Sequence, residues 1–114
     1  MKELRDLAKA VLGREGHQLE CVSSGTEALR RLIAQPEEVD LLITDHHMPG
    51  MDGIELVQKV RERKIHCRIM VFCSALSRDV HDAYRRLSVD RMLYKPVMPA
   101  ELRTAIREIF AEKK

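Results

Sequence analysis

The chain has 114 residues, a formal net charge of +2, and charged residues of both signs in similar number. This length is enough for one hydrophobic core, so we expect one domain over residues 1–114. The small net charge gives no reason to expect nucleic-acid binding. No apolar run approaches the roughly 20 residues of a membrane span, and no secretory signal pattern is present. Three scattered cysteines without metal-ligand spacing are typical of the reducing cytoplasm.

The first residues predict a helix followed by a strand. Apolar residues recur at helical spacing over residues 2–12, and Gly16 is a suitable residue to end that helix. Residues 17–22 then alternate between polar and apolar side chains. This alternation predicts a strand near the edge of a sheet.

A second helix and a buried strand are expected next. Ser24 and Glu27 have the S-x-x-E spacing of a capping box, and Pro36 lies just beyond the expected end of the helix. Over residues 39–44, the apolar residues Leu41, Leu42 and Ile43, with Val39 and Thr44 at the flanks, lead into Asp45. Such a run is typical of a strand buried on both faces, as in a parallel sheet.

The rest of the chain repeats this alternation of helix and strand. Asp52 and Ser77 are candidate N-caps of the third and fourth helices. Residues 68–73 and 91–94 have the composition of strands, and Pro99 suits the first turn of a last helix. Strands that alternate with helices predict an α/β fold, with a parallel sheet and helices on both faces.

Three side chains with complementary chemistry follow three successive strands. Asp45, Ser74 and Lys95 each come directly after a predicted strand. Because the carboxyl ends of parallel strands meet at one edge of the sheet, we expect the three to converge there. A carboxylate is a candidate nucleophile, while a hydroxyl and an ammonium group can hold phosphoryl oxygens. Taken singly, each has an ordinary structural role, as a cap, a turn residue or a solvated side chain.

These segments resemble the receiver domains of two-component response regulators. The matching segments are L-L-I-T-D-H-H-M-P-G-M-D-G at residues 41–53, V-F-C-S-A at 71–75, Y-K-P at 94–96, and S-G-T-E-A-L at 24–29. The resemblance covers essentially the whole chain. It implies a flavodoxin-like (CheY-like) fold with strand order 2-1-3-4-5.

The resemblance also implies roles for individual residues. Asp45 would accept a phosphoryl group from a sensor histidine kinase or a phosphotransfer protein. Ser74 and Lys95 would bind the phosphoryl oxygens, and Mg²⁺ would be held by Asp45 and the backbone carbonyl of His47. Ser74 would also act in the conformational switch. The other candidate switch residues are Met92 and Tyr94. Met92 occupies the position at which the family usually has an aromatic residue, and Tyr94 lies on the same face of the strand.

The beginning of the chain departs from the family. Receivers start with an apolar strand that ends in a pair of Mg²⁺-binding acids, whereas here a helical pattern follows Met1 at once. Either the sequence starts late or the protein lacks that strand. Without the acids, Mg²⁺ binding by one carboxylate and one carbonyl should be weak. Without the strand, the sheet must rearrange or be completed by another chain, so we expect a homodimer formed by strand or element exchange.

Two further interpretations remain open. The chain is a phosphoryl-accepting signalling domain, or it is a degenerate receiver that acts as an interaction or dimerisation module without phosphorylation. A true enzyme is disfavoured because the chain lacks the D-x-D motif of aspartate phosphatases and an early phosphate loop for a flavin.

His46 and His47 are adjacent, so their side chains diverge. We expect them to affect the local field around Asp45 rather than to bind a metal.

Overall fold

The structure is a computed structural model that describes residues 2–22, 24–48, 50–74 and 76–111. The chain divides into two compact units. One unit is Val22–Lys95, and the other combines Met1–Cys21 with Pro96–Lys114. The single domain expected over residues 1–114 stays a prediction.

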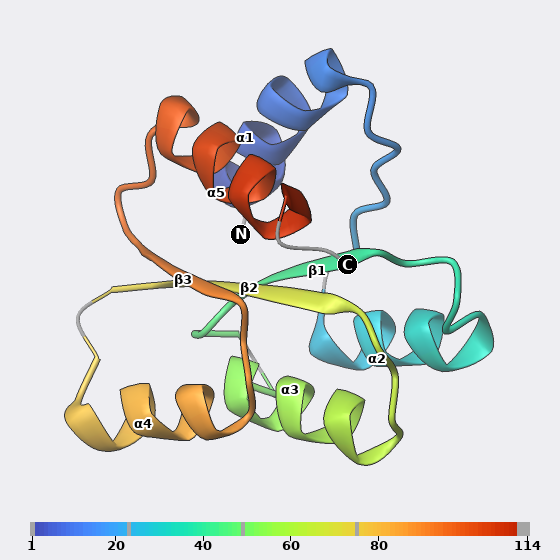
Figure 1. The fold of residues 1–114 in the computed structure, drawn as a ribbon. Helices are drawn as coiled ribbons and strands as arrows, with labels where there is room; N and C mark the ends of the chain where they lie inside the picture. The colour runs from blue at the N-terminus through green and yellow to red at the C-terminus, as the bar shows by residue number, and fades with distance from the viewer. Residues whose placement is uncertain (1, 23, 49, 75, 112–114) are drawn as a thin grey trace. The chain divides into compact units, whose positions relative to one another are not determined.

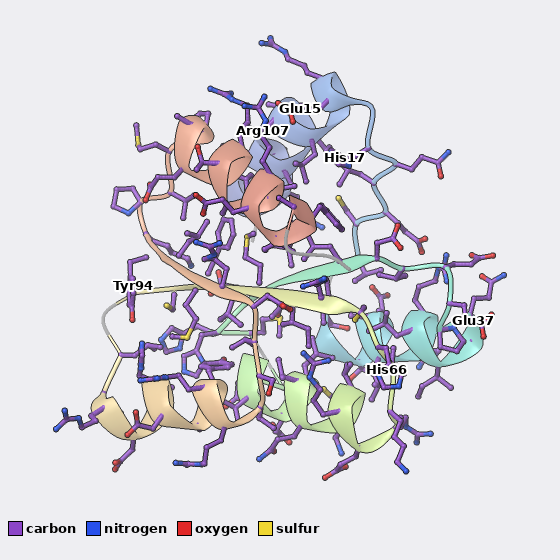
Figure 2. The ribbon with its side chains drawn as sticks, in the orientation of Figure 1. Glu15, His17, Glu37, His66, Tyr94 and Arg107 are labelled. Carbon is purple, nitrogen blue, oxygen red and sulfur yellow. The ribbon has the colours of Figure 1, made fainter. Side chains whose placement is uncertain are left out.

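The unit built from the chain ends consists of helices. It contains α1 (Lys2–Leu12), the short 3-10 helix η1 (Gly13–Glu15) and α5 (Pro99–Ala111). Two side-chain contacts join its two parts. Glu15 pairs with Arg107 at 3.0 Å, and both residues are labelled in Figure 2. The ring of His17 stacks on Phe110. Gly16 ends the first part with φ of 86°, a left-handed conformation that suits glycine. The predicted helix, its stop at Gly16 and the opening of α5 at Pro99 are confirmed.

The larger unit contains a parallel sheet of three strands in the order β1-β2-β3. The strands are β1 (Leu41–Asp45), β2 (Arg68–Cys73) and β3 (Arg91–Tyr94), and Figure 1 shows them side by side. In the pairing register, Asp45 lies opposite Phe72, and Cys73 lies opposite Tyr94. The carboxyl ends of all three strands therefore lie at the same edge of the sheet.

Three helices cover one face of this sheet. They are α2 (Gly25–Ala34), α3 (Gly53–Glu62) and α4 (Arg78–Arg86), and Figure 1 shows them together on that face. Their apolar sides pack with the strands around one cluster of buried residues. The cluster, here called the core cluster, contains Leu32, Leu56, Val57, Val60, Ile65, Cys67, Ile69, Val71 and Tyr84.

The sequence predicted correctly where these helices begin. Ser24, Asp52 and Ser77 each accept a hydrogen bond from the backbone N–H three residues later, at 3.1, 2.9 and 3.3 Å. Each cap satisfies one of the backbone donors that a helix start leaves without an intrahelical partner. The caps fix the ends of α3 and α4 that lie nearest to the carboxyl edge of the sheet.

One predicted strand is wrong. Residues 17–22 are described, and they form no strand. Alternating polarity indicates a strand only when a neighbouring backbone supplies the hydrogen bonds, and in the described part of the chain this segment has no ladder partner. The predicted strand over residues 39–44 is observed as Leu41–Asp45, because pairing with β2 continues as far as Asp45.

Candidate functional site

Asp45 is a buried carboxylate with a hydrogen-bond donor on each oxygen. It ends β1 and is 3% exposed. Its Oδ2 lies 2.5 Å from Nζ of Lys95, and its Oδ1 accepts a hydrogen bond from the backbone N–H of His47 at 3.2 Å. A buried carboxylate is stable only when paired in this way. The position thus combines a charge hidden from water with a cation in direct contact.

Lys95 is held in place by its backbone and leaves its charged end accessible. It follows β3 directly, and its backbone N–H donates to the carbonyl of Cys73 at 2.8 Å. Its side chain is 39% exposed, against 4% for the side chain of Asp45. Lys95 can therefore exchange its contact with the carboxylate for a contact with an incoming anion without leaving the strand end.

Ser74 lies at the same edge of the sheet but is not part of this ion pair. It follows β2 directly and is exposed. In the described structure, no hydrogen bond joins it to Asp45 or Lys95. Since β2 is the central strand, its end lies between those of β1 and β3. The hydroxyl is therefore free to donate to a group that binds above the strand ends.

The next residue, His46, makes a contact that the sequence did not predict. Its Nδ1 lies 2.6 Å from the hydroxyl of Tyr84, and the two rings meet edge to face with centroids 5.5 Å apart. Tyr84 comes from α4, and its side chain is fully buried. One signal was available, because a tyrosine within an apolar helix face needs a polar partner for its hydroxyl.

Burial dominates the electrostatics of this region. Burial, together with the neighbouring His47, lowers the pKa of His46, while Asp52 and Asp45 oppose that shift less strongly. Burial also raises the pKa of Tyr84 and of Cys73, since each is charged only when deprotonated. The charge of Asp45 acts on His46 less strongly than burial does. The expected effect of the two histidines on Asp45 stays a prediction.

The residues do not form a complete Mg²⁺ site. No group of three His, Cys, Asp or Glu side chains that could hold a metal occurs in residues 2–22, 24–48, 50–74 and 76–111. Mg²⁺ requires octahedral oxygen coordination, usually with carboxylates. Asp45 is a single carboxylate, and both of its oxygens already accept hydrogen bonds. This donor set does not fit a tightly bound Mg²⁺ ion.

The two candidate switch residues on β3 have different surroundings. Met92 is half-buried and packs against the core cluster. Tyr94 is 45% exposed and is labelled in Figure 2. The sulfur side chain thus occupies the inner position, while the tyrosine ring remains in contact with solvent.

Comparison with known proteins identifies the family. Residues 1–107 match the family model described as "Response regulator receiver domain". The chain is 34% identical over 90 residues to the nitrate/nitrite response regulator protein NarL of Escherichia coli strain K12, covering 78% of this chain and 40% of NarL. It is 28% identical over 105 residues to sporulation initiation phosphotransferase F of Bacillus subtilis strain 168, covering 92% of this chain and 83% of that protein.

Several other relatives are much longer than this chain. The chain spans 11% of the sensor histidine kinase AruS of Pseudomonas aeruginosa, and 18% of a putative transcriptional regulator of Haloferax volcanii. Among solved structures, a receiver domain protein from Clostridium thermocellum superposes with a TM-score of 0.87 at 23% identity, covering 99% of this chain and 90% of that one. A probable response regulator/GGDEF domain protein superposes with a TM-score of 0.85 at 27% identity, covering 97% and 46%.

These comparisons carry family-level consequences. Receiver domains are signalling modules, they generally bind Mg²⁺ at the phosphorylation site, and they interact with sensor histidine kinases or phosphotransfer proteins. None of the helices described here is long and apolar enough to cross a membrane. With a family match over most of its length and a parallel sheet of the flavodoxin-like type, the chain belongs to the response regulator receiver domains of two-component signalling.

Proposed function

We propose that Asp45 is the phosphoacceptor of this receiver domain. The observation that carries the proposal is the buried carboxylate at the end of β1, in contact with Nζ of Lys95 at 2.5 Å. A surface aspartate would not need a cation held against it from the end of β3. Family membership supplies the phosphoryl donor, which is a phosphohistidine of a sensor histidine kinase or a phosphotransfer protein.

The proposed reaction is a direct transfer between two side chains. A carboxylate oxygen of Asp45 attacks phosphorus, an O–P bond forms, and the N–P bond of the phosphohistidine breaks, with its electron pair left on the imidazole nitrogen. Lys95 then moves from the carboxylate to the phosphoryl oxygens and neutralises their charge. Ser74 donates its hydroxyl to another phosphoryl oxygen. The chain turns over no substrate of its own in this scheme, so we propose that it is not an enzyme.

We propose that Mg²⁺ assists this transfer only weakly. The candidate ligands are the Asp45 carboxylate and the backbone carbonyl of His47. One carboxylate supplies little of the charge that Mg²⁺ prefers. In this chain the charge of Lys95 takes a larger part in holding the phosphoryl group.

The test is a Mg²⁺ titration with a small phosphodonor such as phosphoramidate, followed by intact-mass analysis. Wild-type protein should gain one phosphoryl group, and Asp45→Asn should gain none. Glu62→Gln, which removes an exposed carboxylate at the end of α3, is the matched control and should label like the wild type. Equal, negligible labelling of wild type and Asp45→Asn would contradict the proposal.

A second candidate function is a phosphorylation-independent interaction module. The observation that favours it is the single carboxylate at the strand ends of the described sheet. If labelling fails at every Mg²⁺ concentration while the protein still binds a kinase or phosphotransfer protein, this interpretation replaces the first.

We further propose that the chain acts in the cytoplasm, where its three cysteines remain reduced.

We also propose that the chain forms a homodimer by strand or element exchange. In the described sheet, β1 is a terminal strand, with β2 on one side only. A terminal strand offers backbone groups that another chain can pair. Sedimentation over a range of concentrations should show a dimer. A monomer at all concentrations with a five-stranded sheet would contradict this proposal.

A further inference from the structure

A buried hydrogen bond joins the residue after Asp45 to helix α4. Nδ1 of His46 and the hydroxyl of Tyr84 are 2.6 Å apart. The side chain of Tyr84 is 0% exposed and that of His46 9% exposed, so water does not compete for either group. In such surroundings a hydrogen bond is strong, and leaving one partner unsatisfied is costly.

The backbone of His46 is fixed on both sides. Its N–H donates to the carbonyl of Phe72 on β2 at 2.9 Å, and its carbonyl accepts from the N–H of Gly53 at 2.9 Å. The backbone at this point therefore cannot shift without breaking a bond to β2 or to the start of α3. A change at the neighbouring Asp45 must be accommodated by side chains.

Gly53 shows how tightly the elements meet here. A Cβ placed on Gly53 would overlap the hydroxyl of Tyr84 and would lie only 3.0 Å from the carbonyl oxygen of Asp45. The ends of β1 and α3 and the buried face of α4 are thus in contact around one point. Close-packed interiors transmit displacements because they contain little free space.

The two tyrosines of the chain differ in their relation to this point. Tyr94 is 45% exposed, whereas Tyr84 is buried and bonded to the residue next to Asp45. Tyr84 also lies on the inner side of a helix whose outer side is charged. Exposed side chains on that outer side are Arg78, Asp79, Arg85 and Arg86.

We propose that Tyr84 is a positioning residue that transmits a change at Asp45 to helix α4 through its hydrogen bond to His46. This inference rests on the proposed function of Asp45. Phosphorylation there would add charge and would draw Lys95 away from the carboxylate oxygen that it contacts, next to the oxygen that accepts from the His47 N–H. Because hydrogen bonds hold the His46 backbone, the structural change at Asp45 is taken up by the His46 ring. A shift of this ring moves the Tyr84 hydroxyl bonded to it, and with it helix α4. The position of the charged outer side of α4 would then differ between the phosphorylated and the unphosphorylated protein.

The test compares α4 in wild type and Tyr84→Phe by amide NMR, with beryllofluoride as the phosphoryl mimic. The Phe variant keeps the ring and removes only the hydroxyl. The amides of His47 and Lys95 report binding at Asp45, and the amides of Ala83 and Arg85 report the response of α4. We expect binding to be retained and the α4 response to shrink at least about twofold, within the range seen for residues that couple sites.

Two control variants separate a loss of coupling between Asp45 and α4 from a general disturbance of the structure. Thr104→Val removes an exposed hydroxyl on α5, outside this hydrogen bond, and should leave the α4 response unchanged. His46→Asn places a hydrogen-bonding atom near the position of Nδ1 and should retain most of the response. If Tyr84→Phe does not fold, His46→Leu, which removes the same hydrogen bond from the other partner, takes its place.

A third arm tests the coupling without any phosphoryl mimic. Asp45→Asn removes the charge directly, and it should shift the α4 amides in an otherwise wild-type chain more than in a Tyr84→Phe chain. An unchanged α4 response in Tyr84→Phe, in both arms, would overturn the inference and leave the proposed phosphoacceptor intact. Absence of any beryllofluoride effect on wild type would instead contradict the proposed function, while the Asp45→Asn arm still decides the coupling.

Discussion

At the scale of single residues, Asp45 and Lys95 form an asymmetric pair. The carboxylate side chain is 4% exposed, while the lysine side chain is 39% exposed. A buried charge that loses its partner keeps its full desolvation cost, whereas an exposed charge is hydrated again. The two halves of this ion pair are therefore unequal in what they contribute to stability.

Lys95→Met should accordingly destabilise the protein more than Asp45→Asn does. Removing the lysine leaves a buried carboxylate without its cation, and we expect a loss of about 1–3 kcal/mol in the free energy of unfolding. Urea denaturation at neutral pH measures both variants. The double variant serves as control and should lose less than the sum of the two single losses. A larger loss of unfolding free energy for Asp45→Asn than for Lys95→Met would contradict the unequal contributions argued for this ion pair.

Gly53 gives a second prediction at this scale. Gly53→Ala places a Cβ against the Tyr84 hydroxyl and at 3.1 Å from the Cα of His46, so we expect a loss of about 1–3 kcal/mol from overpacking. Gly13→Ala is the matched control, since nothing lies within 4 Å of its added Cβ. Thermal unfolding of both variants should show a lower midpoint for Gly53→Ala alone. Equal midpoints would mean that the space around Gly53 adapts.

At the scale of elements, capping of α3 was readable from the sequence and has a measurable value. Asp52→Ala removes the acceptor of the Glu55 N–H at 2.9 Å, so it should cost about 1 kcal/mol in unfolding free energy. Asp52→Asn keeps an equivalent acceptor and should cost much less. Chemical denaturation of the pair separates the cap from the charge. A similar loss in both variants would assign the effect to the charge of Asp52.

Arg61 connects α3 to the residues just after α4 through hydrogen bonds. The sequence alone does not identify these bonds. Its guanidinium donates to the carbonyls of Leu87, Cys67 and Ser88 at 3.0, 3.2 and 3.0 Å. Only the fold shows which three carbonyls converge on it.

Arg61→Lys should be nearly as harmful as Arg61→Ala. A lysine ammonium is a point charge and cannot reach three carbonyls that fit the planar fork of arginine, so we expect a loss of about 1–3 kcal/mol. Arg63→Lys, at an exposed position just after α3, is the matched control and should be close to neutral. Differential scanning calorimetry compares the three. Full stability of Arg61→Lys would show that one carbonyl contact is sufficient.

At the scale of the whole molecule, buried acidic groups predict a loss of stability at alkaline pH. Burial raises the pKa of Cys67 and of Cys73. Above the usual thiol value of about 8.5, the unfolded chain loses these protons while the folded chain keeps them, so the free energy of unfolding falls as pH rises.

Urea denaturation between pH 7 and pH 10 measures this loss. Cys67→Ala should be less stable than wild type at pH 7, because it leaves a cavity, yet it should lose less stability as pH rises. The measurement at pH 7 is the reference for each variant. Parallel curves for wild type and Cys67→Ala would show that the Cys67 thiol is not responsible.

Much of the fold could be predicted because its signals are local. Helix periodicity, the caps Ser24, Asp52 and Ser77, and the three strand segments each depend on a few consecutive residues. The segment 17–22 was misjudged because a strand also requires a partner, which the alternation of side chains does not supply.

The order of strands and helices along the chain sets which side chains reach the carboxyl edge of the sheet. Parallel strands joined by helices all end at that edge, so Asp45, Ser74 and Lys95 had to follow one another there. The contact of Lys95 with Asp45, the exposure of Ser74 and the contact of His46 with Tyr84 become visible only in the folded arrangement. The physical reason is that such contacts depend on register and packing between segments distant in sequence, where a displacement of one ångström makes or breaks a hydrogen bond.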